Sequence, residues 1–166
     1  MIHLLPLDEP RLEQLLRDPD GGLRALVSNA SEAKSFLQPV LLQQSLDFHR
    51  RVGSRAPWHS YFGVESDGNR LVGVCSFKGN PNAAGEVEIA YGTVPELVGR
   101  GHATGMAMAL VKIALQSPAI QRVIAHTFAE TNASTRVLQK TGMNKVGEVI
   151  DPEDGKVWQW EIRRPA

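Results

Sequence analysis

Residues 85–111 read GEVEIAYGTVPELVGRGHATGMAMALV, and this stretch decides the fold. Residues 85–94 alternate in hydrophobicity as a strand does. Residues 102–117 are apolar on nearly all sides, which is typical of a helix buried against a sheet. Between the two, Gly99 and Gly101 permit backbone conformations that other residues avoid. The sequence therefore predicts a strand, a glycine-rich turn and a buried helix in succession.

The glycine-rich turn is a candidate site for a phosphate or pyrophosphate. The helix that follows directs its free amide groups and the positive end of its dipole toward the turn. Arg100 adds a cation, and Thr104 adds a hydroxyl in the first helical turn. A tight turn with no ligand is the alternative, and the spacing alone does not decide between the two.

Two nucleotide-binding motifs resemble this turn but do not fit it. In the dinucleotide fingerprint, a third glycine would stand where the chain has Thr104, and Glu130 would bind the ribose. Only 36 residues follow Glu130, too few for the rest of such a domain. Glu86 and Glu88 are also out of place in the buried parallel strand that this fold requires. A Walker loop is excluded because no Gly-Lys-Ser/Thr follows.

The composition predicts one cytoplasmic domain over residues 1–166. Hydrophobic residues make up 42% of the chain, enough for a core. The charges of the 18 basic and 18 acidic residues cancel, so the chain lacks the net positive charge that attracts nucleic acids. No apolar run reaches the roughly 20 residues needed to cross a bilayer, so neither nucleic acid nor membrane is expected as a partner. The single cysteine, Cys75, fits a reducing compartment, and the five histidines show no metal-ligand spacing.

The rest of the chain predicts an α/β domain with hairpins in its first half and a β-α-β unit at its centre. Turn residues 18–22 are expected to end a first helix. Pro39 is expected to interrupt a second helical region, for which Ser31 is the candidate cap. Further strands are expected at residues 1–7, 60–66, 70–77, 122–128, 145–150 and 156–162, and a short helix at 132–141.

Residues 85–111, followed by NASTRVLQKTGM at 132–143, resemble the Gcn5-related N-acetyltransferases (GNAT). Within that superfamily the likeness is greatest to the branch of the ribosomal-protein N-terminal acetyltransferases, the RimJ/RimL type. The family pattern Gln/Arg-x-x-Gly-x-Gly/Ala here reads VGRGHA from Val98 to Ala103. Val98 therefore departs from the pattern, and only its backbone is expected to serve a phosphate.

This resemblance implies a mixed, mostly antiparallel sheet with helices on both faces. The strands at 85–94 and 122–128 would splay apart and open a cleft for acetyl-CoA. The amides of residues 99–104 would hold its pyrophosphate, and the main chain near Tyr91 and Thr93 would pair with its pantetheine arm. The cofactor-binding residues implied in this way are Thr93, Val98, Gly99, Arg100, Gly101, His102, Ala103, Thr104 and Asn132.

The resemblance also implies how acetyl transfer would proceed. The Tyr91 N–H would polarise the acetyl carbonyl. A protonated amine must lose a proton before it attacks, and Glu86 and Glu88 lie on one face of the cleft-side strand. Glu88 is the candidate base, acting through water, although both residues can equally be exposed strand carboxylates.

The leaving thiolate needs a proton as well. Many relatives use a tyrosine for this step, and Leu138 occupies its position here. Ser134 is therefore the candidate proton donor. Helix capping is the alternative role for both Ser134 and Asn132.

The sequence thus predicts an acetyl-CoA-dependent N-acetyltransferase that works by direct attack in a ternary complex. The acceptor is expected to be a protein or peptide N-terminus or another small primary amine. Residues 23–60 contain few acids, so no carboxylate-rich pocket for a polycation is expected. A non-catalytic CoA-binding sensor and a protein-interaction domain on the same fold are the alternatives. A homodimer is compatible with the sequence.

Overall fold

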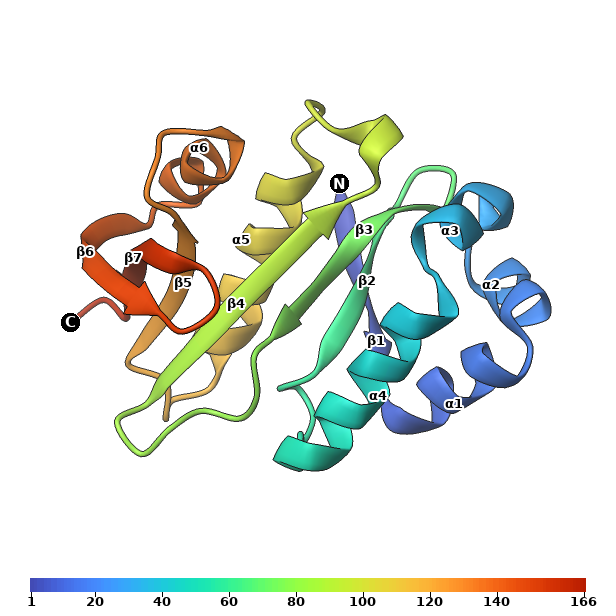
Figure 1. The fold of residues 1–166 in the computed structure, drawn as a ribbon, viewed down its shortest axis with the longest axis horizontal. Helices are drawn as coiled ribbons and strands as arrows, with labels where there is room; N and C mark the ends of the chain where they lie inside the picture. Colours follow the sequence, from blue (N-terminus) through green and yellow to red (C-terminus); the bar gives the residue numbers. More distant parts are fainter.

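Seven strands form one sheet in the order β1-β2-β3-β4-β5-β7-β6 in the computed structural model, which describes residues 1–166 (Figure 1). All neighbouring strands are antiparallel except β4 and β5, which are parallel. The mixed, mostly antiparallel sheet predicted from the sequence is therefore confirmed. The strands are β1 (Ile2–Leu7), β2 (Ser60–Glu65), β3 (Arg70–Phe77), β4 (Glu86–Thr93), β5 (Arg122–Phe128), β6 (Asn144–Asp151) and β7 (Gly155–Arg163).

Helices cover both faces of this sheet, as expected. In Figure 1, α4 lies in front of β2 and β3, whereas α5 lies behind β4. No helix is both long and apolar enough to span a membrane. The helices are α1 (Glu9–Arg17), α2 (Pro19–Leu26), α3 (Ala30–Phe36), α4 (Pro39–Val52), α5 (His102–Gln116) and α6 (Ala133–Lys140), with a 3₁₀ turn at Pro95–Leu97.

Each covered face has its own hydrophobic core. The first core joins α5 and α6 to the back of the sheet, and the second joins α1–α4 to the front of β1–β3. The α5 helix approaches closely because two strand glycines leave room for Met106. A Cβ at Gly63 would lie 2.5 Å from Met106 Sδ, and one at Gly73 would lie 2.7 Å from Met106 Cε. This packing fixes where the N-terminus of α5 lies relative to β4.

The first half of the chain contains one helix more than the sequence analysis expected. Residues 18–22 do end the first helix, since Asp18 is the C-cap of α1, but they form no turn. Instead α2 begins at Pro19, because the Asp18 carboxylate accepts a hydrogen bond from Gly21 N–H at 3.1 Å and Pro19 occupies the first turn. Pro39 does divide the next helical region, where it begins α4. Ser31 is not a cap, since α3 already begins at Ala30.

The sheet opens between β4 and β5. These strands pair only at Glu86–Arg122, Val87–Val123 and Glu88–Ile124. From Ile89 to Thr93, β4 pairs only with β3 on its other side. The predicted splay is therefore confirmed, and it leaves one edge of β4 without a neighbouring strand.

Candidate active site

The open edge of β4 presents main-chain groups to the cleft. In an antiparallel pair, hydrogen-bonded and non-bonded residue pairs alternate. Lys78 N–H donates to Glu88 O, and Val94 N–H donates to Val72 O, which makes the even-numbered residues of β4 the ones bonded to β3. The N–H groups of Tyr91 and Thr93 therefore point away from β3, toward the space that β5 has left.

The glycine-rich turn lies beside this edge. Gly99 and Gly101 have φ angles of 79° and 82°, which only glycine adopts readily, and Gly101 is the N-cap of α5. A Cβ on either glycine would meet no atom within 4 Å. The amides at the start of α5 therefore face open space rather than packed protein.

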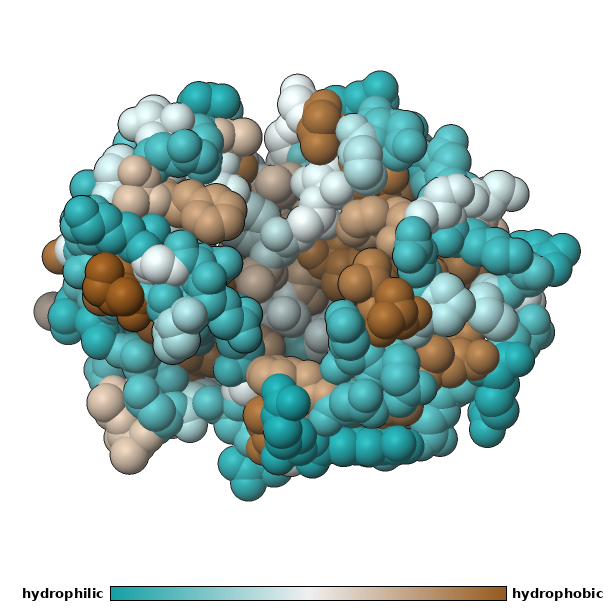
Figure 2. Space-filling view, viewed as in Figure 1, coloured by the Kyte–Doolittle hydropathy of each residue, from teal (hydrophilic) through white to brown (hydrophobic).

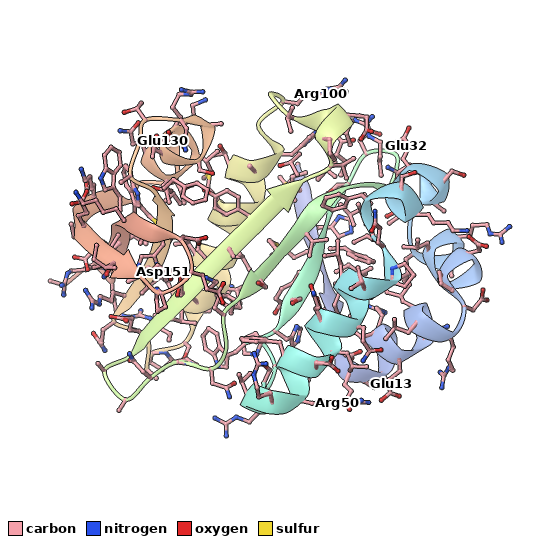
Figure 3. All side chains as sticks on the ribbon, viewed as in Figure 1. Glu13, Glu32, Arg50, Arg100, Glu130 and Asp151 are labelled. Atoms are coloured by element: carbon pink, nitrogen blue, oxygen red, sulfur yellow. The ribbon has the colours of Figure 1, made fainter.

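Together, these groups line a cavity of about 350 Å³ between β4, the turn, α5 and α6. The cavity brings together most of the cofactor-binding residues expected from the sequence. Arg100 does not line it; the residue is exposed and lies on the outer side of the turn (Figure 3). The residues that line this first cavity are Tyr91, Gly92, Thr93, Leu97, Val98, Gly99, Gly101, His102, Ala103, Thr104, Ala133, Ser134, Arg136, Val137 and Lys140.

Two cations of this cavity were missed in the sequence analysis. Arg136 and Lys140 are exposed and lie on α6, across from the glycine-rich turn. Their spacing of four residues places them on one face of the helix. That spacing, in the segment that follows Asn132 and Ser134, was the sequence signal from which the two cations could have been predicted.

The His102 side chain points into the protein. It is only 7% exposed, and its Nε2 atom has no hydrogen-bond partner and lies 3.6 Å from Glu65 Oε1. Burial lowers the pKa of His102, although Glu65 opposes this effect. Its side chain therefore adds no cation to the cavity, and the main chain of its helical turn is what it offers a ligand.

A second, polar cavity of about 280 Å³ adjoins the first, and Ser134 lines both. In its lining, His126 Nδ1 lies 2.7 Å from Glu88 Oε1, and Lys78 Nζ lies 3.3 Å from the same oxygen. No group of three or more His, Cys, Asp or Glu side chains is arranged to hold a metal ion. The lining residues are Lys78, Glu88, His126, Thr127, Phe128, Asn132, Ser134, Asp151, Asp154 and Val157.

The structure separates the two candidate carboxylates. Glu86 forms an ion pair with Arg122, which also contacts Glu161 at 2.7 Å. The hydrogen bond from Arg122 is the main cause that lowers the pKa of Glu161. Glu86 is thus part of a charge network beside the cavity, whereas Glu88 lines the cavity itself.

The residues at the start of α6 differ in their hydrogen bonding. Asn132 caps the helix: its Oδ1 accepts from Thr135 N–H at 3.1 Å, and Thr135 Oγ1 accepts from Asn132 N–H at 2.9 Å. The Ser134 hydroxyl makes no hydrogen bond within the protein, and the Ser134 carbonyl accepts from the Tyr91 hydroxyl at 3.3 Å. Burial raises the pKa of Tyr91 to about 12. Ser134 therefore has a free hydroxyl where the two cavities meet.

The polar cavity also corrects an expectation. It contains three carboxylates, Glu88, Asp151 and Asp154, and none of them lies in residues 23–60, where such a pocket was sought. Asp151 comes from the end of β6, on the hairpin beside β4 (Figure 3). Asp151 and Asp154 were missed because they come from the β6–β7 hairpin, far along the chain from residues 23–60.

A third, apolar cavity of about 390 Å³ adjoins the polar cavity at Lys78, which lines both cavities. In Figure 2 the middle of this face is hollowed, and hydrophobic residues border it on the side of α3 and α4. Its lining residues are Leu7, Phe36, Leu37, Leu41, Leu42, Gln44, Ser45, Phe48, Ser60, Val74, Ser76, Phe77 and Lys78.

Residues 3–144 match the family model described as an acetyltransferase (GNAT) domain. The chain belongs to the GNAT acetyltransferase family. The match spans most of the chain, so the resemblance predicted from two short motifs is confirmed, and with it an N-acetyltransferase that uses acetyl-CoA. No curated protein matches the sequence.

Solved structures of other acetyltransferases share the fold at low sequence identity. Aminoglycoside acetyltransferase AAC(6′)-Ib in complex with coenzyme A and kanamycin aligns over 99% of this chain and 95% of its own, with a TM-score of 0.70 and 15% identity. The ribosomal L7/L12 alpha-N-protein acetyltransferase RimL with coenzyme A aligns over 98% and 93%, with a TM-score of 0.63 and 16% identity. A chimera of spermidine N-acetyltransferase SpeG from Vibrio cholerae and hSSAT aligns over 98% and 95%, with a TM-score of 0.66 and 12% identity.

Proposed function

We propose that this GNAT protein acetylates a primary amine, a peptide N-terminus or a small amine, by direct attack on acetyl-CoA in a ternary complex. One observation carries the proposal: the free main-chain edge of β4 and the glycine-rich turn line one cavity, which meets a polar cavity at Ser134. Acetyl-CoA supplies the activated thioester. The chain supplies two adjoining spaces, one for the cofactor and one for the amine.

The first cavity would hold the cofactor along its length. Amides of residues 99–104 would bind the pyrophosphate, since they lie in the turn and at the N-terminus of α5, where Gly99 and Gly101 leave open space. Val98, His102 and Ala103 would contribute main chain only. Arg100 on the turn and two cations of α6, Arg136 and Lys140, would attract the phosphates.

The arm of the cofactor would extend along β4. The N–H groups of Tyr91 and Thr93 would pair with its amides as a neighbouring strand would, and Asn132 would contact the region of the thiol. The Tyr91 N–H would then stabilise the oxyanion that forms on the acetyl carbonyl. The Ser134 hydroxyl would give a proton to the leaving thiolate.

The polar cavity would receive the amine. Glu88 would assist its deprotonation there, with Lys78 and His126 as neighbours. A peptide α-amine ordinarily titrates at about 7.7–8.0, below a lysine side chain, so less assistance is needed to deprotonate it. The apolar cavity beyond Lys78 would then hold an apolar side chain of the same peptide.

A polycationic acceptor, such as an aminoglycoside or polyamine, is the second candidate. Asp151 and Asp154 in the polar cavity favour it. However, Asp151 Oδ1 already accepts hydrogen bonds from the N–H groups of Glu153 and Asp154 in the turn. The apolar cavity also has no carboxylate that could bind a polycation. A peptide with an apolar side chain therefore suits the polar and apolar cavities together better.

A competition assay tests the proposal. Acetyl-CoA is offered with N-terminal peptides, polyamines and aminoglycosides, and thiol release gives a specificity constant for each. We expect a peptide with an apolar side chain to be preferred. A polyamine or aminoglycoside preferred by orders of magnitude would overturn the peptide assignment, and CoA binding without turnover of any amine would indicate a sensor.

A further inference from the structure

His126 has a position that the sequence did not single out. It lies on β5 two residues beyond Ile124, the last residue paired with β4. Side chains two residues apart in a strand share a face, so His126 reaches across the opening to Glu88. Their 2.7 Å contact therefore lies where the cleft begins, in the cavity that also contains the Ser134 hydroxyl.

The contact with Glu88 determines which imidazole nitrogen is free. An ionised carboxylate only accepts hydrogen bonds, so Nδ1 of a neutral His126 must carry the proton. The lone pair then lies on Nε2, which makes no hydrogen bond within the protein. The side chain is 26% exposed, which leaves this nitrogen open to the cavity.

The charges around His126 come from four residues on three segments. Lys78 follows β3, Glu88 lies on β4, and Asp151 and Asp154 belong to the β6–β7 hairpin. Backbone N–H groups of Asp154 and Glu153 lower the pKa of Asp151, with smaller effects of Lys78 and His126. A protonated His126 would therefore have carboxylates on two sides, against one cation, Lys78.

We propose that His126 Nε2, rather than Glu88, removes the proton from the acceptor ammonium, and that Glu88 is a positioning residue that holds the imidazole in the required tautomer. This inference rests on the proposed acetyl transfer. An imidazole is a stronger base than a carboxylate, and its titration range is the nearest to neutral pH.

Acetyl transfer removes two protons from the acceptor ammonium. The ammonium gives one proton to His126, the free amine forms a C–N bond to the acetyl carbon, and the C–S bond breaks. The nitrogen loses its second proton as the amide forms, and the thiolate sulfur gains one. His126 returns its own proton to solvent.

Kinetic pH profiles of variants test the proposal. His126→Ala should lower kcat/KM by about 10²- to 10⁴-fold and remove the acid limb of its pH profile. Added imidazole should restore part of the rate, because the cavity then has room for it. Glu88→Gln should keep the acid limb and cost about 10- to 100-fold. Glu86→Gln, which changes a residue outside the cavity, is the matched control and should keep the parent profile.

Two results would overturn the proposal. One is an acid limb that persists in His126→Ala and disappears in Glu88→Gln, which would make Glu88 the base. The other is a His126→Ala enzyme that binds CoA as the parent does but gains no rate from imidazole. Failure of the parent protein itself to acetylate any amine would instead refute the proposed function.

Discussion

The two cavities that meet at Ser134 present different groups to their ligands. The first cavity, which we assign to the cofactor, offers mainly main chain, from the free edge of β4 and the turn at residues 98–104. The polar cavity offers side chains from separate elements, with the Glu88–His126 pair at its centre. A main-chain site depends on backbone conformation and free volume, and a side-chain site depends on charge and identity. Substitutions should therefore affect the two cavities in different ways.

The largest expected effect, on CoA affinity, comes from filling the first cavity. Gly101→Leu places a side chain where a Cβ now meets no atom, in the space assigned to the pyrophosphate. We expect CoA affinity, measured by calorimetry, to fall by at least about 100-fold. The matched control is Gly68→Leu, at a φ of 78° in the β2–β3 turn with equally open surroundings. Both variants should lose about 1–2 kcal/mol of stability to backbone strain, and equal CoA affinity in the two would refute the assignment.

Ser134 tests the boundary between the cavities. Ser134→Ala removes only the hydroxyl, so CoA affinity should stay within about twofold while kcat falls about 10-fold or more. Asn132→Ala, by contrast, removes the cap of α6 and should lower the free energy of unfolding by about 1 kcal/mol. Stopped-flow thiol release and thermal melts distinguish the two, and an unchanged kcat in Ser134→Ala would exclude it as proton donor.

The apolar cavity provides a smaller test on the acceptor side. Leu41 lines it and is 45% exposed, whereas its neighbour Val40 is 56% exposed and lies outside. Leu41→Asn should raise KM about fivefold for peptides with an apolar side chain, as expected from the loss of about 1 kcal/mol of apolar contact. Val40→Asn should leave KM unchanged. Equal KM values for both variants would place the peptide elsewhere.

Exposed cations should matter least for the cofactor. Arg136→Ala and Lys140→Ala should each weaken CoA binding by up to about fivefold at low salt, because exposed ion pairs contribute little. The difference from the parent should shrink at high ionic strength, where such charges are screened. A salt-independent loss in either variant would show that the side chain acts by something other than charge.

The charge network beside the polar cavity gives the smallest expected effect, on stability. The pKa of Glu161 lies below its ordinary 4.5, chiefly through the hydrogen bond from Arg122. Its contribution is therefore present above pH 4.5 and is lost as the pH falls through the lowered value. Glu161→Gln should melt a few degrees below the parent at pH 7 and together with it at more acidic pH. A gap that persists in acid would contradict this origin.

Elements whose signal is local were predictable from the sequence. The strand, turn and helix of residues 85–116 form where their alternation, glycines and apolar character predicted. The helix at Pro19 was missed because Asp-Pro-Asp-Gly-Gly is also the composition of a turn. What decides is the Asp18 cap, and an aspartate before Pro-Asp-Gly-Gly can begin a turn as readily as it caps a helix.

The same distinction explains what was predictable of the site. The residues of the glycine-rich turn that line the first cavity follow one another in the chain, so a motif reveals them. Lys78, His126 and Asp151 become neighbours only through the strand order β3-β4-β5-β7-β6, which no local pattern specifies. Arg136 likewise lines the first cavity only because α6 lies opposite the glycine-rich turn.

Acetyl transfer itself is tested most directly by thiol release from acetyl-CoA with and without an N-terminal peptide. Direct transfer predicts free CoA thiol and acetylated peptide in equal amounts, with negligible thiol, and no burst of it, when the peptide is omitted. Thiol released at the same rate without any amine, or CoA binding with no amine ever acetylated, would contradict direct transfer in the cleft between β4 and β5.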